Sequence, residues 1–360
     1  MNDRQREILR SRLQNEKEIL KKLREIYRQA ERDIDAKIAE LLARTDTENL
    51  PSIIYQLDYQ KALKKQIGAI LDELNANQFK SISEYLAAAY ENGFIGTLYD
   101  IQGQGVPLIF PIDQDEVTRA IIHDTRLSNP LYTKLGKDIQ ELKKRIQAEL
   151  SRGISQGFSY ADISRNLHTV TQIGYGKAMR IAWTEGHRIA NEATYDVQKR
   201  AKANGADIVK QWDSTLDNKT RPMHRQLDGQ VRELDDPFEV NGYTAQYPGG
   251  FGIAKMDIHC RCAMLQRARW ALEQEDGEGF TKFDNFSKTI EEFDSRHTYN
   301  TFKKSFWSKE NTSYMNYVQT LEERYETKNF KRILELMTDR EYAHYSKLLK
   351  ANPIYKGVVE

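Results

Sequence analysis

The sequence predicts a predominantly α-helical protein that contains a small α+β module. Apolar residues recur at helical spacing along most of the 360-residue chain. Strand formers and an Asn-Gly turn are confined to a stretch that begins near Ala206. At roughly 100–200 residues per domain, the pattern predicts a helical N-terminal region at 1–149, a module at 150–275 and an aromatic-rich helical C-terminal region at 280–360.

Residues 1–45 are expected to form one long amphipathic helix. Residues 1–50 hold 12 basic and 11 acidic side chains, which suits a helix whose other faces are solvated. The stripe predicts a helix that packs against one partner. Its apolar members follow steps of three, four or seven: Leu9, Leu13, Leu20, Leu23, Tyr27, Ala30, Ile34, Ile38 and Leu41.

The helical body is expected to continue as a series of antiparallel helices. Pro51 and the cap-type residues before it predict a turn after the first helix. The second helix is expected from about Ser52 to Asn77. Later helices are expected around Tyr85, near Asp113, from Asn129 to Ser151, from Ser159 to before Gly174, and from Tyr175 to Ala203.

The mixed stretch begins after Gly205. Ile208, Val209 and Trp212 predict a short strand, and Asn241-Gly242 between strand formers predicts a β-hairpin. An acidic, glycine-containing break at 274–279 ends this stretch. The 280–360 region holds 15 of the 36 aromatic residues, and helical core packing is a better interpretation of them than stacking on nucleic acid.

Composition excludes several classes of function. Fifty-four basic and 53 acidic residues leave no global field to attract nucleic acid or an acidic membrane. Two cysteines one residue apart cannot form a disulfide framework, so a reducing compartment is expected. The charged N-terminus does not resemble a signal peptide, and no window approaches the ~20 apolar residues of a membrane-spanning helix.

The candidate site lies between Trp212 and Cys262, a stretch with both cysteines and two of the seven histidines. Thr220 is expected to cap a short helix that Gly229 ends in the left-handed conformation. On that helix Arg221, His224 and Asp228 are expected to share one face.

Several interpretations of this stretch stay open. His224, Cys260 and Cys262 supply three of the four ligands that a structural zinc prefers, and His259, Asp217 or Asp228 is a candidate for the fourth. The cysteines are otherwise expected to be reduced and to pack beneath a loop. In the enzymatic interpretation, His224 is a general base oriented by Asp228 or Asp217, and Arg221 binds an anion.

No complete catalytic set is present. The common nucleotide-binding, zinc-protease and hydrolase motifs do not occur in the sequence. Glu185 follows Trp183 and Thr184, and it is expected to be a helix-surface carboxylate that pairs with Arg188 or Lys177.

Residues 150–265 resemble the phage head morphogenesis family, whose minor head proteins are similar to the Mu F protein. His259 stands where the family commonly has Asn. The resemblance is carried by elements in the family's order: Gly157-Phe158-Ser159-Tyr160 with Ile163, Thr184-Glu185 followed by Gly205, Trp212, Asp217, Thr220-Arg221, His224, Leu227-Asp228-Gly229, Pro248 and Cys260-Arg261-Cys262.

The resemblance implies a minor capsid protein of a tailed phage or prophage that acts in head morphogenesis. Its implied partners are the portal protein, the scaffold or the major capsid protein, together with contact to packaged DNA. Assembly would take place in the bacterial host cytoplasm, and the product would lie in the virion head. The alternative is a metal-dependent hydrolase, nuclease or injected effector centred on His224.

Overall fold

The computed structural model describes residues 1–43, 53–104, 125–155, 160–203, 205–269, 272, 299–327 and 330–353. Four long helices come first: α1 (Asp3–Ala43), α2 (Ile53–Gly103), α4 (Thr125–Ser155) and α5 (Tyr160–Ala203). The chain forms two compact units, one of 15–86 with 125–185, and one of 1–14, 87–124 and 186–360. The predominantly helical fold class with a small mixed module is confirmed.

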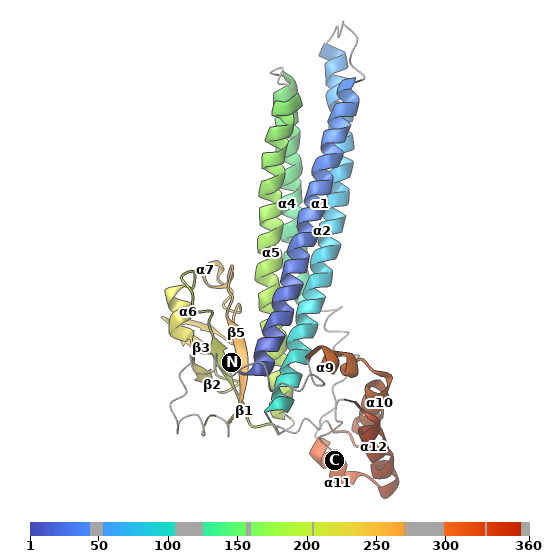
Figure 1. The fold of residues 1–360 in the computed structure, drawn as a ribbon, viewed down its shortest axis with the longest axis vertical. Coiled ribbons are helices and arrows are strands. Elements are labelled where there is room, and N and C mark those ends of the chain that lie inside the picture. The colour runs from blue at the N-terminus through green and yellow to red at the C-terminus, as the bar shows by residue number, and fades with distance from the viewer. Residues whose placement is uncertain are drawn as a thin grey trace. The chain divides into compact units, whose positions relative to one another are not determined.

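The first unit, called the helical unit below, is a bundle of α1, α2, α4 and α5 (Figure 1). Lys22 pairs with Glu84 at 2.8 Å, while the Tyr27 hydroxyl donates to Gln78 at 2.8 Å. A later residue of α1 thus contacts an earlier residue of α2, so the two helices are antiparallel, as predicted. The buried core draws on all four helices: Tyr27, Ala30, Ile34, Ile38, Ile67, Leu71, Leu74, Ile139, Leu142, Ile146, Leu150, Ile163, Leu167 and Ala178.

Burial along α1 confirms only the second half of the predicted stripe. From Leu23 to Ile38 the predicted positions are buried and pack within the chain's own bundle, so these positions need no external partner. In the first half, Leu13 is 42% exposed. Arg12 and Glu16 are buried there instead. The apolar residues alone therefore gave the wrong face for this end of the helix.

Two predicted helix breaks are wrong. Helix α2 continues through 77–84, and α5 continues through Gly174. A Cβ at Gly174 would lie 3.0 Å from Leu142 and 3.2 Å from Tyr27, so this glycine permits close helix packing rather than a turn. Packing against the neighbouring helices thus outweighs the low helix propensity of glycine at this position. The helix expected near Asp113 lies outside the described residues.

The second unit contains the mixed module, residues 205–269. Strand β1 (Ile208–Asp213) lies centrally between β2 (Val231–Arg232) and β5 (Ala263–Ala268), antiparallel to both. Strands β3 (Phe238–Val240) and β4 (Tyr243–Ala245) form the predicted hairpin. Its turn residues Asn241 and Gly242 have φ of 49° and 77°, as an Asn-Gly turn requires. Two short helices complete the module: α6 (Pro222–Leu227) and α7 (Ala254–Asp257).

The C-terminal part is helical, as predicted for 280–360, although 280–298 lies outside the described residues. It consists of α9 (Tyr299–Phe306), α10 (Lys309–Arg324), α11 (Phe330–Leu336) and α12 (Asp339–Ala351). Thr338 and Glu341 form a capping box at the start of α12. The aromatic side chains of Tyr299, Phe306, Tyr314 and Tyr345 are buried, which supports core packing. Within the part of the chain that the structure describes, no helix has the length and apolar character to cross a membrane.

Candidate functional site

The mixed module has its own small core, and the candidate site lies inside it. Trp212 on β1 is fully buried and faces Phe238 at 5.2 Å and His224 at 6.1 Å between ring centroids, both edge-on. The whole buried cluster comprises Trp212, Leu227, Phe238, Val240, Met256, Cys260, Cys262 and Met264. The predicted site residues His224, Cys260 and Cys262 are therefore core residues of this module.

The sheet register brings the two halves of the sequence motif together. Trp212 on β1 pairs with Met264 on β5, and Asp213 pairs with Ala263. Cys262 directly precedes β5, so it lies just beyond this paired end of the sheet. The loop after β1 leads to α6 at the same end. Helix α6 carries His224 there.

Ser214 fixes α6 in place. Its hydroxyl donates to the His224 carbonyl at 2.6 Å and accepts from the Trp212 indole at 3.1 Å. Its backbone N–H donates to the Asp228 carboxylate at 2.8 Å. The middle of α6 and its C-cap residue are thereby tied to the residue that follows the central strand. Through this contact the Asp228 carboxylate anchors the loop that follows β1.

Two sulfur atoms converge on one nitrogen of His224. Nδ1 lies 3.2 Å from Cys262 Sγ and 3.7 Å from Cys260 Sγ. The three ligand atoms all lie within 4.8 Å of one another, and all three side chains are buried. His224 Nε2 is also buried, and among the described residues it has no hydrogen-bond partner. This arrangement can bind a soft or borderline cation.

The two thiols differ in their acidity. A hydrogen bond from Cys260, followed by that from His224, lowers the pKa of Cys262 against the effect of burial. The hydrogen bond to Cys262, together with burial, raises the pKa of Cys260. The two thiols are therefore coupled, and Cys262 is the more acidic of the two.

None of the three candidate fourth ligands joins this cluster. Asp217 is held by Arg261 in a bidentate ion pair, with N–O distances of 2.6 and 2.7 Å. That guanidinium keeps the pKa of the Asp217 carboxyl well below its usual range. His259 is exposed and has φ of 57°. Asn adopts this left-handed conformation more readily than most residues, which is a physical reason why Asn suits the position.

The predicted shared face of Arg221, His224 and Asp228 is not formed. Arg221 is the N-cap residue of α6, where Thr220 had been expected, and its guanidinium donates to the carbonyls of Met256, at 3.0 Å, and Ile258. Asp228 follows the helix at its C-cap, so the three side chains point to separate partners. Arg221 thereby links α6 to the segment that leads into Cys260.

The remaining predicted residues have structural contacts. The Thr220 hydroxyl donates to the Thr215 carbonyl, and it also lies 3.1 Å from the Asp217 carboxylate. Gly229 has φ of 78°, and its N–H donates to the Trp212 carbonyl at 2.9 Å. Thr220 therefore does not cap α6, contrary to expectation. The left-handed conformation expected of Gly229 is confirmed.

Glu185 lies on α5 and is partly exposed. Arg188 pairs with Glu192 at 3.1 Å, and Lys177 pairs with Glu141 at 2.6 Å. The expected pairing of Glu185 with Arg188 or Lys177 stays a prediction. Glu185 belongs to the residues of the helical unit, whereas the His–Cys cluster belongs to the mixed module.

Sequence reasoning missed Asn191, which anchors the module to the C-terminal half of α5. Its amide donates to the carbonyls of Cys262, at 3.0 Å, and Pro248, at 3.2 Å, while its oxygen accepts the Met264 N–H at 3.1 Å. The side chain is only 1% exposed. A polar residue on the buried face of a long helix was the signal that could have identified it.

A second polar hub was also missed. The Asp100 carboxylate accepts hydrogen bonds from Asn2 and Gln5 of the N-terminal segment, from Gln104 after α2, and from Gln266 on β5. Burial nevertheless raises the pKa of this carboxyl above its usual value. These contacts join three segments that are distant in sequence, and no local pattern marks them.

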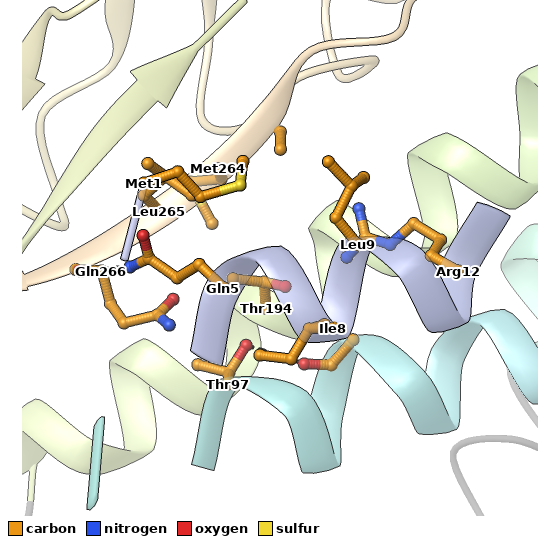
Figure 2. Close-up of a pocket in the computed structure, with 12 residues that line it drawn as sticks. Met1, Gln5, Ile8, Leu9, Arg12, Thr97, Thr194, Met264, Leu265 and Gln266 are labelled. Carbon is orange, nitrogen blue, oxygen red and sulfur yellow. Dashed lines mark hydrogen bonds between the residues drawn. The ribbon is translucent and has the colours of Figure 1, made fainter. Parts of the chain in front are cut away.

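A small cavity lies beside this hub (Figure 2). It holds about 30 Å³, room for one or two water molecules. Figure 2 shows polar and apolar side chains around it, and the full lining is Met1, Gln5, Ile8, Leu9, Arg12, Gly93, Thr97, Thr194, Ala263, Met264, Leu265 and Gln266.

Comparison with known proteins shows two kinds of relative. The chain is 30% identical over 301 residues to NAD(+)--arginine ADP-ribosyltransferase EFV of Enterococcus faecalis (strain ATCC 700802 / V583), a match that covers 82% of this chain and 59% of that protein. It is 27% identical over 270 residues to minor head protein GP7 of Bacillus phage SPP1, covering 70% of this chain and 86% of that protein. The chain thus spans less than two thirds of the transferase. No solved structure matches it.

The family match locates this similarity in the chain. The model for Phage Mu protein F like protein matches residues 144–265. That range ends three residues after Cys262, and it includes Asn191, Trp212 and His224, which build or support the buried cluster. The resemblance seen in the sequence is therefore confirmed: residues 144–265 match the model of the Mu F-like phage proteins, and the chain is similar to a minor head protein over most of that protein's length.

Proposed function

We propose that the chain is a minor head protein of a tailed phage or prophage and that it acts in head assembly by binding the portal protein or the procapsid shell. The observation that carries this proposal is the match to minor head protein GP7, which extends over 86% of that protein. That match is longer than the family match itself, so it reaches beyond the 144–265 module. Head assembly is thus proposed for the whole chain.

The geometry of the site supports a structural role. His224 is 2% exposed, and no carboxylate among the described residues joins the His–Cys cluster. A general base must reach the proton that it removes, and a hydrolase needs room for its substrate. The hydrolase or nuclease hypothesis centred on His224 with Asp217 and Asp228 finds no support in this arrangement.

The partner is expected to meet an outer surface rather than the α1 stripe, since the second half of that stripe packs inside the bundle. Deleting the N-terminal helix would therefore disrupt the bundle and would not test docking. Leu216 on the mixed module and Ile173 on α5 are large apolar side chains at 56% and 45% exposure. They offer a matched pair of substitutions that should leave each core intact.

The test is co-expression with the portal, scaffolding and major capsid proteins of the parent phage, followed by gradient sedimentation. We expect the chain to sediment with procapsid-sized particles in a few copies each. Loss of this sedimentation in Leu216→Glu but not in Ile173→Glu would assign docking to the mixed module, and the reverse would assign it to the bundle. A wild-type chain that stays at the top of the gradient would refute the proposal.

A second candidate function comes from the relative named as an arginine ADP-ribosyltransferase. The match leaves 41% of that protein uncovered. This chain has the activity named for that protein only if the catalytic residues of that protein lie in the matched part. Incubation of the purified chain with labelled NAD and an arginine-containing acceptor tests this. We expect no transfer of label, and transfer would replace the structural proposal with an enzymatic one.

A further inference from the structure

We propose that His224, Cys260 and Cys262 bind one zinc ion, with His224 Nδ1 and both sulfur atoms as ligands. Zinc takes nitrogen at about 2.0–2.1 Å and sulfur at about 2.3 Å in a tetrahedral arrangement. Those bond lengths place a nitrogen and a sulfur ligand about 3.5 Å apart. The two Nδ1–Sγ distances, 3.2 and 3.7 Å, lie on either side of this value.

The convergence of two sulfur atoms on one nitrogen favours a metal over a simple hydrogen bond. An imidazole nitrogen carries either one proton or one lone pair, so it forms one good hydrogen bond. The second sulfur atom gains nothing from that bond. A cation between the three atoms satisfies all of them at once.

Charge balance favours a divalent cation. Two thiolates and one neutral imidazole bring a charge of −2 into a site walled by Trp212 and Phe251, and an uncompensated buried charge is costly. A Zn²⁺ ion brings the total to zero. Because the described ligands are sulfur and nitrogen, the site selects zinc over magnesium or calcium, which prefer oxygen.

The surrounding contacts hold the ligands in place before the metal arrives. Ser214 fixes the His224 backbone, Arg221 fixes the segment before Cys260, and Asn191 fixes the Cys262 carbonyl. The metal would then join α6 to the start of β5, segments nearly 40 residues apart in sequence. Among the residues that the structure describes, no further His, Cys, Asp or Glu joins these three ligands.

The first test is zinc content by elemental mass spectrometry on the full chain, purified under reducing conditions without chelator from zinc-supplemented medium. We expect about one zinc per chain. Cys260→Ser and Cys262→Ser should each lose most of it. His259→Asn is the matched control, because Asn adopts the conformation of that position, and it should retain the metal. Zinc retained by both serine variants would overturn the assignment.

A second measurement does not depend on whether the variants fold. The wild-type chain, stripped of metal and loaded with Co²⁺, should show the near-ultraviolet absorption of thiolate–cobalt bonds and the visible bands of a tetrahedral ion. Added zinc should remove both. A wild-type chain that binds neither metal would overturn the proposal. Since these tests use the isolated chain, their outcome is separate from that of the procapsid experiment.

Discussion

The helical unit and the mixed module bury their cores with different kinds of residue. The core of the helical unit is mostly aliphatic and repeats with the helical period. Its ion pairs, such as Lys22 with Glu84, lie at the surface, where such pairs contribute little. Stability in this unit is therefore spread over many interchangeable contacts.

The mixed module buries polar groups that each have a particular partner. Lys210 and Trp212 are fully buried on its central strand, and Ser214 and His224 are buried beside them. Its strands have only two to six residues, too few to form a large apolar core. Buried polar groups are costly unless they are satisfied, so single substitutions should be felt more strongly here than in the bundle.

The largest expected effect is that of Trp212→Ala. Loss of a fully buried tryptophan costs about 4 kcal/mol, and this one contacts His224, Phe238 and Phe251. We expect faster hydrogen exchange throughout 208–268, measured by mass spectrometry, with little change in the peptides of the helical unit.

Leu71→Ala is the matched substitution in the bundle, where the removed side chain is also fully buried. It should cost about 3 kcal/mol and should accelerate exchange in the helical unit instead. If both variants accelerated exchange equally in both regions, the two cores would form one cooperative unit. The proposed difference between them would then be wrong.

Asn191→Ala should have the next largest effect. It removes one acceptor and two donor contacts at once, and it leaves the Met264 N–H and the carbonyls of Pro248 and Cys262 without these partners. We expect a loss of about 2 kcal/mol in the free energy of unfolding, measured by urea denaturation.

Thr194→Val, one turn further along α5, is the control for Asn191→Ala. Within the described part of the chain, the Thr194 hydroxyl donates to one group, the Ala190 carbonyl of its own helix, so its loss should cost clearly less. Equal losses would mean that Asn191 has no special role in holding the module.

The difference between the two regions also explains which features could be predicted from the sequence. Helical periodicity located α1, and the Asn-Gly pair located the β3–β4 hairpin, because both features depend on residues close together in sequence. The proximity of His224 to the cysteines was also expected, since few residues of those types occur.

The sequence could not predict contacts that depend on the packing of distant segments. Gly174 is a helix breaker by propensity, yet Leu142 and Tyr27 pack against it inside a continuous helix. Asn191 and Asp100 obtain their roles from partners that lie tens of residues away. The positive φ of His259 likewise depends on the tertiary path of the chain towards Cys260.

The smallest expected effect is that of replacing Lys210. It is also the most selective test of whether buried polar groups distinguish the mixed module from the helical unit. The Lys210 ammonium donates to the Gln246 side chain at 2.5 Å and to the Gln246 carbonyl at 3.1 Å, and it lies against the rings of Tyr195 and Phe238. Burial lowers the pKa of Lys210 to about 8, although Asp235 and nearby Asp236 oppose this shift.

The sign of the pH effect follows from this lowered pKa. Between about pH 8 and pH 10 the unfolded chain holds a proton on Lys210 that the folded chain has lost, so stability rises with pH over that window. Relative to Lys210→Met, the wild-type chain should gain about 1 kcal/mol from pH 7 to pH 10, since the Gln246 oxygens and the two rings replace part of the hydration that the ammonium loses. Urea denaturation of both proteins at each pH measures this difference. Lys22→Met, at an exposed position of α1, should show no such gain; a gain there as large as at Lys210 would mean that buried polar groups do not distinguish the module from the bundle.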